Sequence, residues 1–352
     1  VMSGDRYNAI VVGAGPAGSA AALIMAQNNL SVALLERGKY PGAKNMFGGS
    51  IYREPTELIV PQFWKEAPLE RAVISDELWF LDQTSAVKIG FSDLRFGMEP
   101  YNKFNVLRSD FDRWLANKAR QAGANLFTET VVRDLIYEPV GLTKKKVAGV
   151  VIDGGEKLYS DLVILAEGSS AFLTEKAGLR GKLEANSFTL YVKEVISLPR
   201  GVIEDRFNLE KEEGSIIGII GYPASGAIGK GGIWVNRDTI SIVVGGYLNQ
   251  LVDKGLSPCH LLTRFKQHPL IQRLLEGGKV EEYQAHTIPK GGYKNIPKLN
   301  DYGLLVAGDA AMMISGRRGT DLAMITGKYA GETASQAWAK GDFSPEILSA
   351  YQ

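Results

Sequence analysis

The stretch Ala9-Ile10-Val11-Val12-Gly13-Ala14-Gly15-Pro16-Ala17-Gly18 decides the fold of this chain of 352 residues. Its apolar first half has the length of a strand buried in a parallel sheet, and its second half is a G-x-G-x-x-G pattern. Small, helix-forming residues continue to about Asn28, and residues 32–35 are a second apolar strand that ends at Glu36. This order of elements predicts a complete βαβ unit at the start of the chain.

The glycines of this unit and Glu36 each have a physical role in binding a dinucleotide. Gly13 permits a tight turn, Gly15 lets a pyrophosphate approach the backbone, and Gly18 lets the helix pack closely on the strand. The N-terminus of the helix offers free N–H groups and a partial positive charge to the phosphates. Glu36, about 20 residues beyond the glycines, can accept a hydrogen bond from a ribose hydroxyl and favours FAD or NAD over NADP. The unit therefore predicts dinucleotide binding rather than an unrelated glycine-rich turn.

The composition excludes several classes of protein. Lys and Arg number 40 against 39 Asp and Glu, with 45% hydrophobic and 22% charged residues, as in an ordinary globular protein. This balanced charge predicts no nucleic-acid partner, because binding a phosphate backbone needs an excess of Lys and Arg. The single cysteine, Cys259, rules out an internal disulfide and a four-thiolate iron–sulfur cluster within these residues, and we expect no metal site.

The cellular location follows from similar observations. No apolar run approaches the ~20 residues that span a bilayer. The first strand leaves no room for a signal peptide, and the lack of disulfides fits a reducing compartment. We therefore expect a cytoplasmic protein that at most binds a membrane surface.

Two later strand ends distinguish FAD from NAD. Residues 161–166 form an apolar strand that ends at Glu167-Gly168, and residues 303–307 form another that ends at Gly308-Asp309-Ala310, before a helical pattern over 320–338. Together with the N-terminal unit, these stretches resemble the flavin hydroxylase and reductase superfamily. In that pattern the aspartate of the G-D motif binds the ribityl and phosphate part of FAD, which implies this role for Asp309.

Arg108 is a further candidate for contact with the flavin. It precedes Ser109, which we expect to cap a helix that runs to about Ala122. The spacing of Phe111, Trp114 and Leu115 predicts that these side chains pack inward. Arg108 would then either reach the flavin, as the matching arginine does in the superfamily, or form a salt bridge on the surface.

Many short segments resemble a narrower family, the electron transfer flavoprotein:quinone oxidoreductases and their FixC relatives. The likeness covers essentially the whole chain. The segments are Gly42-Ala43-Lys44-Asn45, Gly48-Gly49, Lys193-Glu194, Gly221-Tyr222-Pro223, Gly231-Gly232-Ile233-Trp234, Phe265–Pro269, Glu276–Lys279, Gly291-Gly292-Tyr293, Ile296–Leu299 and Arg318-Gly319-Thr320.

The chain departs from the mitochondrial type of this family in two places. That type carries a C-terminal ferredoxin-like region with a four-cysteine cluster, whereas this sequence stops at Gln352 with one cysteine. The resemblance therefore favours FixC, whose iron–sulfur partner is a separate polypeptide. Residues 312–317 are also a shorter run than the family's flavin-facing loop, either because the loop is truncated or because residues are missing from the sequence.

The expected architecture is a Rossmann-like FAD-binding domain of the glutathione-reductase and hydroxybenzoate-hydroxylase type, interleaved with an α+β substrate domain. We assign residues 1–49, 108–178 and 301–352 to the discontinuous FAD-binding domain. Residues 50–107 and 179–300 form the substrate and membrane-facing domain. Alternating apolar residues near 189–192 and 240–244 predict an antiparallel sheet in the second domain.

The residues expected to bind FAD lie at the strand ends and in the segments that resemble the family. They are Gly13, Gly15, Pro16, Ala17, Gly18, Glu36, Arg37, Lys44, Asn45, Gly48, Gly49, Arg108, Val132, Ala166, Glu167, Gly168, Gly308, Asp309 and Ala310. No Ser-His-Asp arrangement and no cysteine pair is present, so the redox chemistry is assigned to the cofactor. No catalytic residue is assigned. Tyr222, Lys193 and Glu194 suit acid–base or structural roles equally, and we expect His286 to be a hydrogen-bonded core histidine.

The resemblance implies an oxidoreductase that accepts electrons from electron transfer flavoprotein subunits of the alpha and beta type. It would pass them through FAD to quinone, as the FixC-like subunit of an NADH-oxidising, electron-bifurcating complex. A reductase of prenyl double bonds is the alternative enzyme, since geranylgeranyl reductases share this fold. A flavin-stabilised scaffold without turnover is the non-catalytic alternative.

A membrane surface and an iron–sulfur protein complete the expected partners. One short stretch mixes aromatic and basic residues, which suits the boundary between lipid tails and headgroups but equally suits the protein's own core. Its members are Phe91, Arg95, Phe96, Met98, Tyr101, Lys103 and Phe104. We expect peripheral binding to the inner face of the cell membrane. A small ferredoxin-like protein would dock near residues 320–338 and 342–345, where the fused region starts in the relatives.

Overall fold

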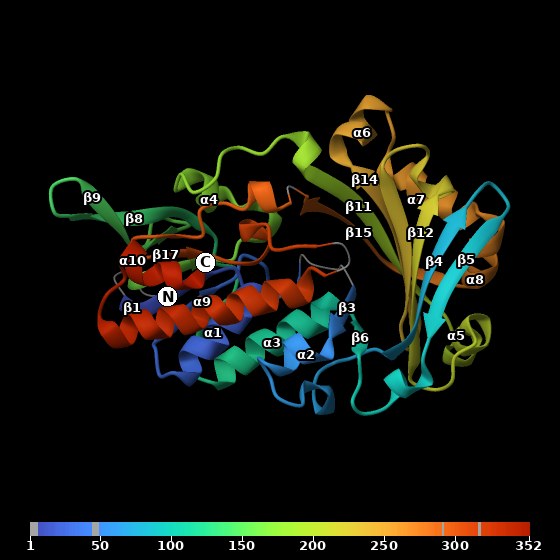
Figure 1. Ribbon diagram of the computed structural model, residues 1–352, viewed down its shortest axis with the longest axis horizontal. Coiled ribbons are helices and arrows are strands. Elements are labelled where there is room, and N and C mark those ends of the chain that lie inside the picture. The colour runs from blue at the N-terminus through green and yellow to red at the C-terminus, as the bar shows by residue number, and fades with distance from the viewer. Residues whose placement is uncertain (1–5, 44–48, 291, 316–317) are drawn as a thin grey trace.

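Two β-sheets stand beside each other in the computed structural model, which describes residues 6–43, 49–290, 292–315 and 318–352 (Figure 1). The first sheet has eight strands and a parallel centre in the order β17-β10-β1-β2-β7. Its strands are β1 (Arg6–Val12), β2 (Val32–Leu35), β7 (Asn125–Phe127), β8 (Val132–Val140), β9 (Lys144–Ile152), β10 (Lys157–Leu165), β16 (Asn300–Asp301) and β17 (Leu304–Val306). The predicted Rossmann-like unit is confirmed.

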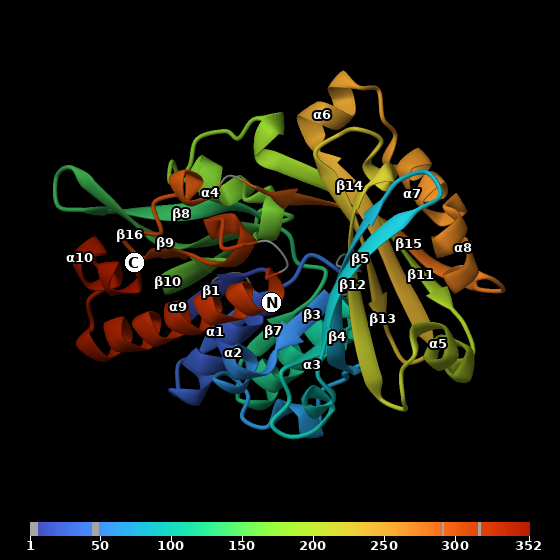
Figure 2. The same ribbon diagram turned by 45° about the vertical axis from the view of Figure 1, so that its right-hand side comes forward.

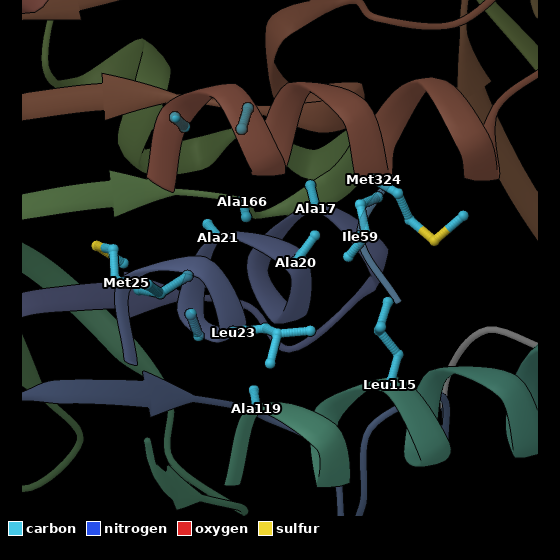
Figure 3. Close-up of a cluster of buried hydrophobic side chains, with 14 of the residues drawn as sticks. Ala17, Ala20, Ala21, Leu23, Met25, Ile59, Leu115, Ala119, Ala166 and Met324 are labelled. Carbon is cyan, nitrogen blue, oxygen red and sulfur yellow. The ribbon is translucent and has the colours of Figure 1, made fainter. Parts of the chain in front are cut away.

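Three helices cover one face of this sheet. They are α1 (Pro16–Gln27), α3 (Arg108–Gln121) and α9 (Thr320–Lys340). Figure 3 shows α1 between the other two, with Leu115 of α3 on one side and Met324 of α9 on the other. A Cβ on Gly327 of α9 would lie 2.0 Å from the carbonyl oxygen of Ala17, so only glycine allows this approach. The close packing fixes the starts of α1 and α9 next to each other.

The other face of the first sheet is covered by an antiparallel extension of the same sheet. β8 pairs with β9, and β9 pairs with β10. Leu135, Val150 and Leu158 from these strands are buried with Ile10 and Val163 of the parallel strands. Alternate residues of β1 and β10 therefore reach two separate cores, as expected for a strand that is covered on both sides.

The second sheet has nine strands and is mainly antiparallel between residues 188 and 289. Its strands are β3 (Gly49–Tyr52), β4 (Ala72–Leu81), β5 (Ala86–Ser92), β6 (Lys103–Val106), β11 (Phe188–Ser197), β12 (Glu213–Gly221), β13 (Gly229–Val235), β14 (Thr239–Tyr247) and β15 (Lys279–Pro289). The antiparallel prediction is confirmed, although β12 and β4 pair in parallel. One face of this sheet packs on α7 (Pro258–Gln267) and α8 (Pro269–Leu275) in a second hydrophobic core.

The remaining helices are short and lie at the periphery of the two sheets. They are α2 (Arg53–Glu57), α4 (Phe172–Lys176), α5 (Arg200–Phe207), α6 (Leu248–Asp253) and α10 (Pro345–Leu348). No helix among the described residues has the length and apolar character required to cross a bilayer.

The start of α3 differs from the prediction. The helix begins at Arg108 with Leu107 at the N-cap position, and no side chain caps it, so the prediction that Ser109 is the cap is wrong. Arg108 is drawn into the first turn because its guanidinium pairs with Asp112 one turn later. The inward packing is confirmed, since Phe111 and Leu115 are buried and Trp114 packs against the same core.

Candidate functional site

A cavity of about 660 Å³ lies between the two sheets. The ends of β1, β2, β10 and β17 and the starts of α1 and α9 line it on one side. Side chains of β4, β11, β12, β13, β14 and β15 line it on the other side. Because the strand ends of an open parallel sheet are the usual ligand site, this cavity is the candidate site.

The glycine loop after β1 is shaped by contacts of the backbone. Gly13 has a φ of +103°, and a Cβ there would lie 2.3 Å from the carbonyl oxygen of Ala166. A Cβ on Gly18 would lie 1.8 Å from the carbonyl oxygen of Gly13, so strand, turn and helix can meet only through glycines. Gly15 is different, since no atom lies within 4 Å of its hypothetical Cβ. That open space, at the start of α1, has the position of the expected pyrophosphate.

Glu36 also lines the cavity and is held in place by the same loop. Its carboxylate accepts hydrogen bonds from the N–H of Ala14 at 3.1 Å and from the N–H of Gly38 at 2.7 Å. The carboxylate therefore lies beside the glycine loop, where a ribose of a bound dinucleotide is expected. Arg37 and Val132 line the cavity nearby.

The end of β10 contributes backbone rather than a charged side chain. Ala166, Glu167 and Gly168 all line the cavity. The Glu167 carboxylate, however, accepts hydrogen bonds from the N–H groups of Leu173 and Thr174, at 2.8 and 2.9 Å. Burial raises the pKa of Glu167, and these hydrogen bonds oppose that rise. Its side chain thus stabilises the start of α4, a role that the sequence did not reveal.

Asp309 lies in the cavity at the end of β17, between cations from two different elements. Burial raises its pKa from 3.8 to about 6, and Arg108 and Lys290 act in the opposite direction. The neighbouring Gly308 donates its N–H to the hydroxyl of Thr326 on α9 at 3.1 Å. The following Ala310 is buried in the core of the first sheet and does not line the cavity.

Arg108 lines the cavity from the start of α3, with a side chain only 12% exposed. Nε and Nη2 bind the two carboxylate oxygens of the buried Asp112 at 2.6 and 2.7 Å. Nη1 donates to the hydroxyl of Thr320, the first residue of α9, at 3.3 Å. Arg108 does form an ion pair, but a buried one, so the alternative of a surface salt bridge is wrong.

The start of α9 is a second helix N-terminus at this cavity. Gly319, Thr320 and Ala323 line it. Since α9 has 21 residues, its N-terminus carries the full partial positive charge of a long helix. The sequence predicted the helix but not that its N-terminus would face the same space as that of α1.

The second sheet and the residue after β15 supply lining residues that the sequence did not identify as a group. They include Leu78, Tyr191, Ile216, Lys230, Trp234, Val243, His286, Ile288 and Lys290. His286 was expected in the core, but it is half-buried in the cavity wall, where it pairs with Tyr191 on the neighbouring strand. Burial, with the positive charges of Arg108 and Arg37, lowers the pKa of His286 to about 4. Lys193, on the same face of β11, is buried, and burial lowers its pKa to about 7.

The structure places the remaining predicted residues in different ways. Gly18 packs inside the loop and does not line the cavity. Gly49 does line it, with no atom within 4 Å of a hypothetical Cβ. Lys44, Asn45 and Gly48 lie outside the described residues, as do Gly316 and Arg317 of the short flavin-facing loop.

The residues present fit FAD. The empty space at Gly15 and the helix N-termini suit the phosphates of a dinucleotide. Glu36 suits a ribose, and Asp309 suits the ribityl part. Among the described lining residues, the cations Arg37, Arg108, Arg133, Lys230 and Lys290 outnumber the acids Glu36, Glu167 and Asp309. A negatively charged pyrophosphate is compatible with that excess.

Known proteins with related sequences agree with this site. The family model of pyridine nucleotide-disulphide oxidoreductases matches residues 7–192. "Protein FixC" of Bradyrhizobium diazoefficiens is 40% identical over 355 residues, which cover 100% of this chain and 81% of that protein. "Protein FixC" of Escherichia coli K12 is 38% identical, with 100% and 82% covered.

Solved structures share the fold at low sequence identity. A geranylgeranyl bacteriochlorophyll reductase-like protein of Thermoplasma acidophilum has a TM-score of 0.81 at 19% identity, with 99% of this chain and 82% of that chain covered. The myxobacterial chondrochloren halogenase CndH, described as a variant of FAD-dependent halogenases, has a TM-score of 0.74 at 18% identity, with 99% and 78% covered. These likenesses show the fold, while the identity to the FixC proteins shows the family. The chain is a FAD-binding oxidoreductase and belongs to the FixC family.

Proposed function

We propose that this protein accepts electrons from electron transfer flavoprotein subunits and passes them through FAD to a quinone. The lining of the cavity carries the proposal. The FAD-binding strand ends face, across one space, an apolar surface formed by Leu78, Ile216 and Trp234 of the second sheet. A flat, apolar quinone suits such a surface, and the alignment with a FixC relative covers the whole of this chain.

Bound FAD would supply transfer of one or two electrons, and the protein would hold and tune it. Gly15 and the start of α1 would bind the phosphates, and Asp309 would bind the ribityl region. The start of α9 and Arg108 place positive charge on the remaining part of the cavity. Since Asp112 and Thr320 fix the Arg108 side chain, its position would not depend on the ligand.

A single-turnover experiment tests the quinone step. The FAD-loaded protein is reduced photochemically without oxygen and mixed with a soluble quinone analogue. We expect the flavin absorbance to return as one hydroquinone forms per flavin. A geranylgeranyl substrate should leave the flavin reduced. Reoxidation by the prenyl substrate but not by the quinone would reject the proposal in favour of the reductase.

Electron supply is proposed to come from alpha- and beta-type electron transfer flavoprotein subunits that oxidise NADH within a bifurcating complex. The test mixes the purified protein with such subunits and follows its flavin spectrum after NADH is added. We expect reduction that is then reversed by quinone. A flavin that stays oxidised with NADH and partner subunits would support the scaffold alternative instead.

Peripheral binding to the inner face of the cell membrane is proposed through a patch that shares Phe91 and Met98 with the predicted stretch. Phe104 is buried in the first core and cannot contact lipid, and Phe96 is partly buried against the second core. The exposed apolar residues belong to β5 and the turn after it, at the front of the second sheet in Figure 2. This β5 patch consists of Val87, Ile89, Phe91, Leu94 and Met98, each more than 60% exposed.

The β5 patch is continuous with the wall of the cavity. Val87 pairs with Phe80, and Phe80 pairs with Ile220, which lines the cavity. Phe80 and Ile220 are themselves 41% exposed. An apolar ligand could therefore pass from a bilayer to the cavity along one face of the sheet, which supports a membrane quinone as substrate.

A small ferredoxin-like protein is proposed to supply the iron–sulfur cluster. One cysteine, Cys259, cannot hold a cluster that needs about four thiolates. The proposed docking surface is the end of α9 with the following residues 342–345, where Trp338 is 40% exposed. Purification of the complex from its native source, with iron analysis, tests this. An iron-free complex that reduces quinone with NADH at full rate would reject the partner.

A further inference from the structure

Lys290 lies immediately after β15, at the point where the second sheet reaches the nucleotide-binding side of the cavity. Its N–H donates to the carbonyl oxygen of Ser187 at 2.7 Å, which anchors the backbone at the end of the strand. Close by, the hydroxyls of Thr287 on β15 and Ser169 after β10 are 3.5 Å apart. The last residues of β15 therefore lie next to the end of β10 in the first sheet.

The Lys290 side chain lines the cavity and is half-buried. It acts electrostatically on Asp309, which belongs to the first sheet. Asp309 in turn lies next to the phosphate-binding loop, because a Cβ on the adjacent Gly308 would be 2.9 Å from the Cβ of Ala17 in the first turn of α1. Asp309, Gly308 and Ala17 thus form a series of neighbouring groups from Lys290 to the open space at Gly15.

We propose that Lys290 binds the pyrophosphate of FAD, so that the second sheet contributes a charged group to cofactor binding. Arg108, the other cation acting on Asp309, is already engaged by Asp112 and Thr320. The helix N-terminus at Gly15 offers N–H groups but no full positive charge. A lysine ammonium on a flexible stem can provide that charge from the opposite wall.

Burial supports this assignment. It lowers the pKa of Lys290, and the nearby Asp309 opposes that change. A partly buried ammonium gains from a bound anion, because the anion replaces some of the water that the group has lost. One FAD molecule would then contact both sheets and hold them together.

Three ligands separate a phosphate contact from a structural effect. FAD and ADP both contain a pyrophosphate, whereas riboflavin contains the flavin ring and ribityl chain without it. The variants are Lys290→Gln and Lys290→Arg, with Lys294→Gln as the matched control, because Lys294 is exposed four residues further on. Dissociation constants for the deflavinated protein are measured by fluorescence quenching and calorimetry at several salt concentrations.

We expect Lys290→Gln to weaken FAD and ADP by about ten- to a hundredfold, the range of a charge-assisted hydrogen bond. Riboflavin should bind as to wild type, Lys290→Arg should recover most of the affinity, and Lys294→Gln should change nothing. The salt dependence of ADP binding should also become shallower in Lys290→Gln. Unchanged ADP affinity, or an equal loss for riboflavin, would overturn the assignment. None of these measurements depends on a quinone, so they stand apart from the proposed function.

Discussion

The two walls of the cavity are built by different means. On the first sheet, the backbone shapes the wall: Gly13 and Gly18 bring strand and helix together, and Gly15 leaves room for a ligand. On the second sheet, side chains such as Tyr191, Trp234 and His286 come from strands far apart in sequence. A wall of backbone depends on a few glycines at fixed spacing, whereas a wall of side chains depends on which face of each strand the fold turns inward.

The largest effect is expected from Gly15→Val on the backbone wall. The new side chain would enter the open space at the start of α1, where no protein atom lies within 4 Å, and would exclude the pyrophosphate. The purified variant should fold but lose its flavin absorbance. Gly181→Val is the control, since Gly181 also has open space around it but lies outside the cavity lining. A Gly15→Val protein with full flavin content would show that the phosphates bind elsewhere.

Asp112→Asn should give the next largest effect, because it leaves the buried Arg108 without its counter-charge. Removing one partner of a buried ion pair costs about 3–5 kcal/mol. Both side chains are nearly inaccessible, at 12% and 0% exposure, so the free energy of unfolding in urea should fall within that range. Asp110→Asn, at an exposed position of the same helix, should change it little. Equal stability of the two variants would mean that Arg108 is held mainly by Thr320.

A smaller effect should come from the protonation of Asp309 in the FAD-free protein. Burial raises its pKa from 3.8 to about 6, so between these values the folded state binds a proton that the unfolded state releases. This group therefore makes stability fall as the pH rises through that window, and it adds no further change above it. Asp309→Asn should flatten this part of the profile of unfolding free energy against pH. If wild type and variant have parallel profiles, Asp309 is already ionised at the lower pH.

The smallest effect is expected from the outer part of the side-chain wall. Ile89→Asp places a charge in the β5 patch at a position 62% exposed, so the fold should tolerate it. Flotation with anionic lipid vesicles should show binding reduced several-fold, because apolar area is lost and the new carboxylate is repelled by the anionic headgroups. Val252→Asp, on α6 at 69% exposure, serves as the control. Equal flotation of both variants would remove the β5 patch as the membrane-binding surface.

The sequence predicted the backbone wall well because its signals are local. The βαβ unit, the strand ends at Glu167 and Gly308 and the helix of α9 follow from short patterns whose spacing is fixed by the geometry of a turn. One error lies at the start of α3, where two local interactions compete. Ser109 was expected to cap the helix, but Arg108, which pairs with Asp112 one turn later, is already its first residue. Glu167 was expected to bind the cofactor and does line the cavity, but the sequence did not predict that its carboxylate accepts hydrogen bonds from the start of α4.

By itself, the sequence determined the nucleotide-binding unit, with Glu36 at its end, and the expected position of the phosphates, because residues close together along the chain supply all of these. Only the tertiary structure decided which residues of the second sheet face the cavity. Because side chains alternate along a strand, Tyr191, His286 and Ile288 point to one face of the sheet and their chain neighbours to the other. Both faces carry apolar residues, so the alternation does not tell which face lines the cavity. The packing of α7 and α8 on one face leaves the other to the cofactor cavity, and no local pattern encodes that choice.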